Sequence, residues 1–359
     1  NLMKTLYYHQ PHTLLNRALR LLQTIIQRKG ILSLFTTLTI LLLPLSVQGQ
    51  TSNKILINSG WEMQDAAIIS KEGMKAGWEM ENAAKVPQEG KVISTTKYKP
   101  SGWYKATVPG TVLTTLVNNG VYPEPLYGEN NRPEVIPEYL CHTDWWYRNE
   151  VMIPDSYKNK TIWLNFDGIN YSADIWVNGH RVGPIKGAFI RGNFDITSFV
   201  KPGQTAIIAV RISPQPNTGV PFEHIMGTVG GPCGGVGRLD GPTFGCSNGW
   251  DWLSGIRDRN SGIWQDVFLS ATGHVLMKDP LITSDLPLPR TDIASVTVQT
   301  TVQNTTGNVQ KGIIKGSFDS IKFEKTIEIA PWRSLTFTFD PKDFAQLNIK
   351  NPKLWWPNG

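Results

Sequence analysis

The chain has 359 residues, of which 40% are hydrophobic and 10% aromatic, enough apolar material for globular cores in two domains. Its formal net charge of +6 invites an interpretation as a nucleic-acid or membrane-surface protein. The distribution of charge excludes a nucleic-acid partner, because residues 1–49 hold five basic and no acidic residues, which leaves thirty basic against twenty-nine acidic residues in the rest of the chain.

Residues 1–49 are predicted to be a leader that contains a secretory signal peptide. Two basic residues precede an apolar run over 31–45, and Val47-Gln48-Gly49 supplies small residues where a signal peptidase cleaves. The run is shorter than the ~20 residues that a membrane-spanning helix needs, and Pro44 near its end favours cleavage. We therefore expect an exported protein, periplasmic or extracellular, with no stable membrane span after cleavage.

Residues 50–273 have the strand and turn pattern of an all-β domain. Side chains of residues 173–177 are expected to point alternately into and out of the domain, and Asn178-Gly179 directly after them is a strong signal for a two-residue hairpin. The turn at 201–204 leads into the apolar segment 206–212. Short strands with frequent turns predict a β-sandwich of the jelly-roll type.

The stretch 145–153 is expected to be one strand of this sandwich. Successive side chains of a strand point to opposite faces, so Trp146 should face away from Trp145 and Tyr147. The three rings therefore cannot all serve one site. Glu150 is expected to be an outward-facing strand residue rather than a catalytic acid.

Between residues 214 and 249 the chain is rich in glycine and is predicted to be an irregular loop. No G-x-G-x-x-G follows a strand there, and no Lys-Ser or Lys-Thr pair closes a phosphate loop, so nucleotide binding has little support. The three cysteines show neither a Cys-x-x-Cys pair nor the histidine spacing of a zinc site. We expect no metal and no cofactor. Whether Cys233 and Cys246 form a disulfide, which would leave Cys141 free, stays open.

The stretch Gly249–Val267, GWDWLSGIRDRNSGIWQDV, combines aromatic rings with carboxylates and guanidiniums. A pyranose offers an apolar face that an indole covers and a rim of hydroxyls that charged groups hydrogen-bond. Trp250, Asp251 and Trp252 are therefore candidates for substrate contact. The alternative is that the tryptophans are core aromatics.

The charged triplet of Arg257, Asp258 and Arg259 follows the three candidates along the chain. It is expected either to brace the loop through bidentate pairs or to form a surface ion-pair cluster. Trp264 and Val267 are expected to lie in the next strand.

Residues 274–359 show a second alternating pattern. Strands are predicted over residues 293–303, 312–318, 326–329 and 334–339. These short strands predict a second β-sandwich.

The string Gly249–Val267 closely resembles the end of the N-terminal sugar-binding domain of glycoside hydrolase family 2. The resemblance is to the branch that holds exo-β-D-glucosaminidases and endo-β-mannosidases. Four further stretches match the same branch in the same order, and together they cover most of residues 55–272: 108–131, 143–154, 163–183 and 201–212.

This resemblance implies a galactose-binding-like jelly roll followed by an immunoglobulin-like sandwich and then by a (β/α)₈ barrel that carries two catalytic glutamates of a retaining β-glycosidase. Residues 354–359 resemble the motif that opens the last strands of the immunoglobulin-like domain. We therefore expect a fragment, inactive by itself, whose partners are the missing barrel of the same chain and a glycan with terminal β-linked glucosamine or mannose.

In this family the N-terminal domain reaches over the barrel, and its loop completes the subsite for the terminal sugar. The resemblance implies that Asp251 accepts hydrogen bonds from sugar hydroxyls and that Trp250 or Trp252 lines the pocket. A rival hypothesis is a secreted carbohydrate-binding module without catalytic machinery, in which the same residues form a lectin-like site.

Overall fold

A computed structural model of the protein describes residues 54–75, 85–218 and 256–356. The predicted leader and the predicted substrate contacts Trp250, Asp251 and Trp252 lie outside the described residues, as do Cys233 and Cys246. Within the described ranges, no helix is both long and apolar enough to cross a membrane.

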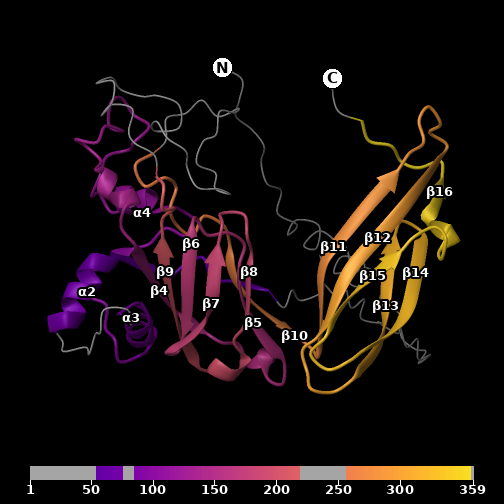
Figure 1. Cartoon of the computed structure of the whole chain (residues 1–359), viewed down its shortest axis with the longest axis horizontal. Helices are drawn as coiled ribbons and strands as arrows, with labels where there is room; N and C mark the ends of the chain where they lie inside the picture. The colour runs from indigo at the N-terminus through magenta and orange to yellow at the C-terminus, as the bar shows by residue number, and fades with distance from the viewer. Residues whose placement is uncertain (1–53, 76–84, 219–255, 357–359) are drawn as a thin grey trace, which may run out of the picture. The chain divides into compact units, whose positions relative to one another are not determined.

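Two antiparallel sheets build the first sandwich (Figure 1). In the smaller sheet the strands follow the order β1 (Ile55–Leu56), β10 (Val267–Thr272), β5 (Thr161–Phe166) and β8 (Gly192–Asp195). In the larger sheet the order is β3 (Tyr104–Lys105), β2 (Glu62–Asp65), β4 (Trp145–Met152), β9 (Thr205–Ser213), β6 (Ser172–Val177) and β7 (His180–Lys186). The 3-10 helices η1 (Glu138–Cys141), η2 (Asp155–Tyr157) and η3 (Thr197–Phe199) lie in the connections.

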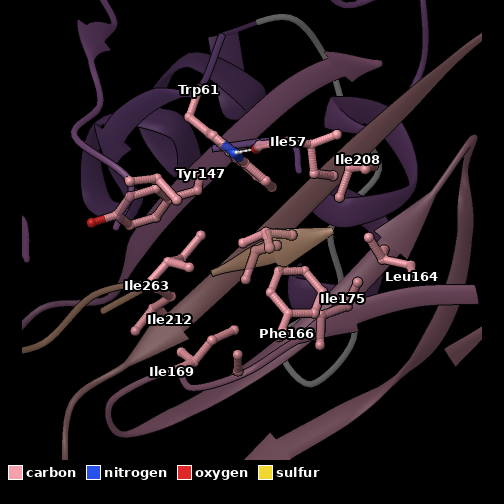
Figure 2. Packing of buried hydrophobic residues seen from close by; sticks show 14 of the residues in the cluster. Ile57, Trp61, Tyr147, Leu164, Phe166, Ile169, Ile175, Ile208, Ile212 and Ile263 are labelled. Carbon is pink, nitrogen blue, oxygen red and sulfur yellow. Dashed lines mark hydrogen bonds between the residues drawn. The ribbon is translucent and has the colours of Figure 1, made fainter. Parts of the chain in front are cut away.

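The core of this sandwich comes from the inward side chains of both sheets. Figure 2 shows Leu164 and Phe166 of β5 with Ile175 of β6 and Ile208 of β9, all fully buried. Each such side chain contributes about 1.5–3 kcal/mol by leaving water. Trp61 is held at the edge of the same cluster because its indole N–H donates to the carbonyl of Ile57 at 2.6 Å. The predicted jelly-roll sandwich is confirmed.

Strand β4 alternates as its sequence predicts. Trp145 and Tyr147 belong to the core between the sheets, whereas Trp146 belongs to a separate cluster on the opposite face of the larger sheet. Glu150 is exposed on this strand, and its carboxylate pairs with Arg148 at 2.7 Å. The prediction of an outward-facing Glu150 is confirmed.

Helices cover the outer face of the larger sheet, which the strand and turn pattern did not predict. They are α2 (Ala66–Lys75) and α3 (Lys85–Ile93). A third helix, α4 (Val112–Asn118), follows β3 and packs with the core between the sheets instead. Ala66, Ile69 and Ile93 bury Trp146 and Trp176, whose ring centroids lie 5.2 Å apart. The two-residue period of strands does not predict these helices, whereas the three-residue step from Ala66 to Ile69 on α2 is typical of one face of a helix.

Two predicted turns are confirmed. Asn178 and Gly179 have φ values of 48° and 86° and join β6 to β7, so that Val177 pairs with His180. This double positive φ is the signature of the type I′ hairpin, which asparagine and glycine adopt at low cost. The turn at 201–204 closes through the amide of Gln204 and the carbonyl of Lys201 at 3.1 Å.

The second sandwich begins after β10, which ends at Thr272. Its first strand, β11, starts at Val275, so the predicted boundary at residue 273 falls between these two strands. One sheet has the order β11-β12-β15, with β16 also on β12, and the other pairs β13 with β14. Its elements are β11 (Val275–Asp285), β12 (Ile293–Asn304), β13 (Gln310–Phe318), β14 (Ile321–Ile329), β15 (Ser334–Phe339), η5 (Ala345–Leu347) and β16 (Asn348–Lys350).

The core of the second sandwich combines aliphatic side chains with packed phenylalanine rings. Phe323 of β14 lies 4.9 Å from Phe339 of β15, measured between ring centroids, and Val302 of β12 is buried beside them. The four strands predicted in this part of the chain are confirmed. Its immunoglobulin-like identity stays a prediction.

Gly90 tests the packing of α3 on the larger sheet. A Cβ atom at this position would overlap the indole of Trp176, so Gly90→Ala must push the helix away or displace the ring. We expect the free energy of unfolding to fall by about 1–3 kcal/mol, measured by urea denaturation. Gly312→Ala on β13 is the control, because its Cβ would meet nothing within 4 Å. Equal stability of the two variants would contradict this packing.

Candidate functional site

The two ends of the segment that carries Trp250, Asp251 and Trp252 are described, although these three residues are not. Thr218 precedes the segment and Ile256 follows it. The Nε of Arg259 donates to the carbonyl oxygen of Thr218 at 2.8 Å. A buried side chain therefore fastens the ends of the segment to each other.

Arg257 and Arg259 converge on one carboxylate, that of Glu138 in η1. Nη1 of Arg257 lies 2.9 Å from Oε1 of Glu138, and Nη2 of Arg259 lies 2.7 Å from Oε2. The arginine side chains are each 1% exposed and that of Glu138 is 13% exposed. We call this arrangement the arginine clamp, defined by Arg257, Glu138 and Arg259.

The remaining donors of the clamp bind backbone carbonyls. Nε and Nη2 of Arg257 both donate to the carbonyl oxygen of Asn131, the Nε bond at 2.8 Å. Nη1 of Arg259 donates to the carbonyl of Ile256 at 3.1 Å. Because a guanidinium is planar and presents its donors in a fixed fork, these bonds determine both position and orientation of the attached backbone. The clamp therefore joins the chain at residues 131, 138, 218 and 256.

Asp258 does not join the clamp but holds the start of α4. Its Oδ2 accepts the backbone amide of Leu113 at 2.6 Å, and its Oδ1 accepts the amide of Asn260 at 2.9 Å. A carboxylate is favourable at a helix N-terminus, where amides are unpaired. Burial raises the pKa of Asp258, while a hydrogen bond from Thr111, these amides and the charge of Arg259 oppose that rise.

The charged triplet is thus buried rather than on the surface. Arg257, Asp258 and Arg259 are 1%, 0% and 2% exposed, which contradicts the surface ion-pair alternative. The reason is that their partners come from distant parts of the chain and not from one another.

The backbone after the triplet makes a tight turn. Arg259 and Asn260 have φ values of 50° and 58°, and the side-chain amide of Asn170 donates to both of their carbonyls at 3.0 and 3.1 Å. Gly262 has a φ of 153°, and a Cβ there would lie 2.5 Å from the carbonyl oxygen of Gly110. This position requires glycine because the backbone that precedes α4 passes directly against it.

Trp264 lies before the next strand and not within it, since β10 begins at Val267. Its indole N–H donates to the carbonyl of Ala188 at 2.9 Å, and its ring meets the edge of Phe189 at 5.7 Å. The predicted strand start was wrong at Trp264 because this side chain is used to attach the neighbouring loop.

Glu138, Cys141 and His142 form the one group in the described ranges whose potential metal-ligand atoms lie within 4.8 Å of one another. Both oxygens of Glu138 already accept hydrogen bonds from the clamp, whose two positive charges repel a cation. Burial raises the pKa of Cys141 to about 11, so its thiol stays protonated at neutral pH. This group is therefore unsuited to hold a metal ion.

The sequence analysis missed Glu138, which is the central residue of the clamp. A buried arginine needs an anion, so the buried triplet itself implies a further acidic partner, but nothing in the local sequence PEVIPEYL around Glu138 identifies it. The carbonyls of Asn131 and Thr218 carry no sequence signal at all, because any residue supplies one.

Replacement of Glu138 tests the clamp. Glu138→Gln removes the carboxylate that two buried guanidiniums share, and we expect the free energy of unfolding to fall by about 3–5 kcal/mol. Glu129→Gln is the matched control, because its pair with Arg132 at 3.2 Å joins side chains that are 70% and 41% exposed and is worth about 0–1 kcal/mol. Denaturant titration of both variants measures the difference, and a similar loss in both would disprove a structural role for the clamp.

Comparison with known proteins gives consistent matches. A family model described as glycosyl hydrolase 2 galactose-binding domain-like matches residues 78–265. The exo-β-D-glucosaminidase of Streptomyces avermitilis is 30% identical over 271 residues, and the mannosylglycoprotein endo-β-mannosidase of Lilium longiflorum is 33% identical over 292 residues. Each alignment covers 74% of this chain, but only 27% and 28% of these relatives.

Solved structures agree with these matches. The crystal structure of the exo-chitosanase of Amycolatopsis orientalis superimposes with a TM-score of 0.63 at 25% identity, covering 86% of this chain and 30% of that protein. The chain thus spans little more than a quarter of the length of its curated relatives. Because the family model covers more than half of the chain, the chain belongs to glycosyl hydrolase family 2, with its galactose-binding domain-like region at residues 78–265.

Proposed function

We propose that this chain is the N-terminal part of an exported, retaining β-glycosidase that removes terminal β-linked glucosamine or mannose. In this proposal Asp251 accepts hydrogen bonds from the sugar, and Trp250 or Trp252 covers its apolar face. The observation that carries the proposal is the arginine clamp, whose two arginines are buried at the end of the segment that bears these residues.

A fixed base matters because binding energy assists hydrolysis only if the contacting groups are already in place. A misplacement of about 1 Å can cost on the order of 100-fold in rate. The clamp and Asp258 attach the residues after the segment to η1 and α4. These attachments suit a segment whose side chains must meet a sugar in one orientation.

The relatives supply the class of substrate. Two matched proteins are named for hydrolysis of β-glucosaminides and β-mannosides, and the proposal takes glucosamine or mannose from them. Cleavage by a retaining mechanism needs two carboxyl groups about 5–5.5 Å apart. Under the proposal, a barrel that follows the two sandwiches supplies both, and this part of the chain has no activity by itself.

Asp251→Ala in the complete protein tests the substrate contact. We expect kcat/KM for a β-glucosaminide or β-mannoside to fall by an amount equivalent to about 2–4 kcal/mol, because the lost hydrogen bond strengthens in the transition state. The initial rates of hydrolysis of a chromogenic glycoside measure it. Unchanged turnover would remove Asp251 from the site.

Glu150→Gln is the control for that experiment. Its carboxylate is exposed and pairs with Arg148 on the same strand, so hydrolysis should be unaffected. If the complete protein binds glycans and does not hydrolyse any of them, the carbohydrate-binding module replaces the enzyme as its function.

Export is the other untested part of the proposal. We expect the mature protein to begin at Gln50, because the apolar run and the small residues up to Gly49 meet the requirements of a signal peptidase. Mass spectrometry of the N-terminal peptide of the exported protein tests this. Retention of residues 1–49 in the mature protein would contradict it.

A further inference from the structure

The outer face of the four-stranded sheet carries a row of side chains that the proposed function does not use. The register of the strands places Leu56, Phe268, Asn165 and Asn193 side by side, one from each strand from β1 to β8. One end of this row is apolar and the other end carries amides. A hollow of about 200 Å³ lies over the part of the row formed by Phe268, Asn165 and Asn193. Trp163, Asp167 and Arg191 also line it, and residues 276–279 of β11 form its other side.

The amide end of the row is held in a defined orientation. The side-chain amide of Asn193 donates to Oδ1 of Asn165 at 2.7 Å, and the amide of Asn165 donates to Oγ of Ser270 at 3.0 Å. Asn165 is only 5% exposed, whereas Asn193 is exposed. Asn193 therefore presents its polar atoms to the hollow in an orientation that its hydrogen bond to Asn165 fixes.

A carboxylate with two loosely placed cations lies beside this amide end. Asp167 has Nζ of Lys54 and Nε of Arg191 each 4.0 Å from its oxygens. This distance allows Coulomb attraction but exceeds that of a hydrogen bond. A ligand hydroxyl between Asp167 and Arg191 would donate to the carboxylate and accept from the guanidinium, replacing one long contact by two charge-assisted hydrogen bonds.

The apolar end of the row suits the C–H face of a sugar ring. Leu56 is 55% exposed and Phe268 is partly exposed. Nζ of Lys54 lies 3.8 Å from the centroid of the Phe268 ring, so this flexible side chain must move aside when a sugar ring packs on that face. The row thus combines one apolar surface with a rim of amide and charged groups, the combination that a pyranose requires.

We propose that this hollow is a second, non-catalytic carbohydrate site that binds one pyranose residue of a glycan. Asp167, Arg191 and Asn193 bind the hydroxyls, and Phe268 contacts the ring. The choice of ligand class rests on the proposed function, but none of these residues belongs to the arginine clamp or to the segment that bears Asp251.

The test uses the full chain with two separate probes, β-1,4-mannobiose and the β-1,4 disaccharide of glucosamine. Calorimetric titration measures affinity, and the NMR signal of the Trp163 indole N–H, assigned with Trp163→Phe, reports on the hollow itself. We expect at least one probe to bind saturably and to shift the Trp163 signal. Asp167→Asn should weaken that binding about tenfold, as expected for a lost hydrogen bond to a charged group.

Asp174→Asn is the matched control, because Asp174 is 33% exposed against 31% for Asp167 and also pairs with an arginine, but lies on the other sheet. The affinity of this variant for the disaccharide should equal that of the unmodified chain. Asn193→Ala, at an exposed position, provides a second variant should Asp167→Asn fail to fold, and it should also weaken binding.

Three results would overturn the second site: no shift of the Trp163 signal with either probe at saturating concentration, unchanged affinity in Asp167→Asn or Asn193→Ala, or an equal loss in Asp174→Asn. Asp251→Ala, made in the complete protein so that hydrolysis can be measured, separates the two proposals. Reduced hydrolysis with an unchanged Trp163 shift supports both sites, whereas normal hydrolysis with a shift that depends on Asp167 removes the proposed role of Asp251 and leaves the second site standing.

Discussion

One buried carboxylate shared by two buried guanidiniums determines how the loops at the end of the first sandwich are arranged. Glu138 accepts from Arg257 and Arg259 at once, and the same arginines bind the carbonyls of Asn131 and Thr218. Three parts of the chain that are far apart in sequence, around residues 131–138, 218 and 256–259, therefore meet at three side chains. Taking such charges out of water is costly, so the arrangement persists only because every donor has a partner.

The clamp depends in turn on the sandwich below it. The turn at Arg259 and Asn260 is held by the amide of Asn170, and Gly262 pairs with Asn170 through two backbone hydrogen bonds of 2.9 Å. Shortly after this turn the chain enters β10, whose alternate side chains Val267, Leu269 and Ala271 are buried between the sheets. Packing of the core thus positions the turn, the turn positions the two arginines, and the arginines hold the ends of the segment that bears Asp251.

Much of the fold followed from the sequence because strands and tight turns depend on local pattern. The alternation around Trp146 and the positive φ values of Asn178 and Gly179 both required only neighbouring residues. The helices over the larger sheet could not be predicted from the strand pattern, because a two-residue period does not reveal the 3.6-residue period of a helix. Glu138 was missed for a different reason: it lies about 120 residues from its arginines, and only the folded chain shows that these three charges are neighbours.

The alternating charges of Arg257, Asp258 and Arg259 are explained by the balance of charge in the interior. Arg257 and Arg259 carry two positive charges into the interior, and Glu138 with an ionised Asp258 would carry two negative ones, so the buried group as a whole is then neutral. Asp258 contributes to this balance from the far side, where the amides of Leu113 and Asn260 and the charge of Arg259 favour its ionised form against the effect of burial. Removing any one of the four would leave an uncompensated charge away from water. The sequence Arg-Asp-Arg therefore does not form an ion-pair chain of its own: both arginines pair with Glu138 of η1, and Asp258 binds the start of α4.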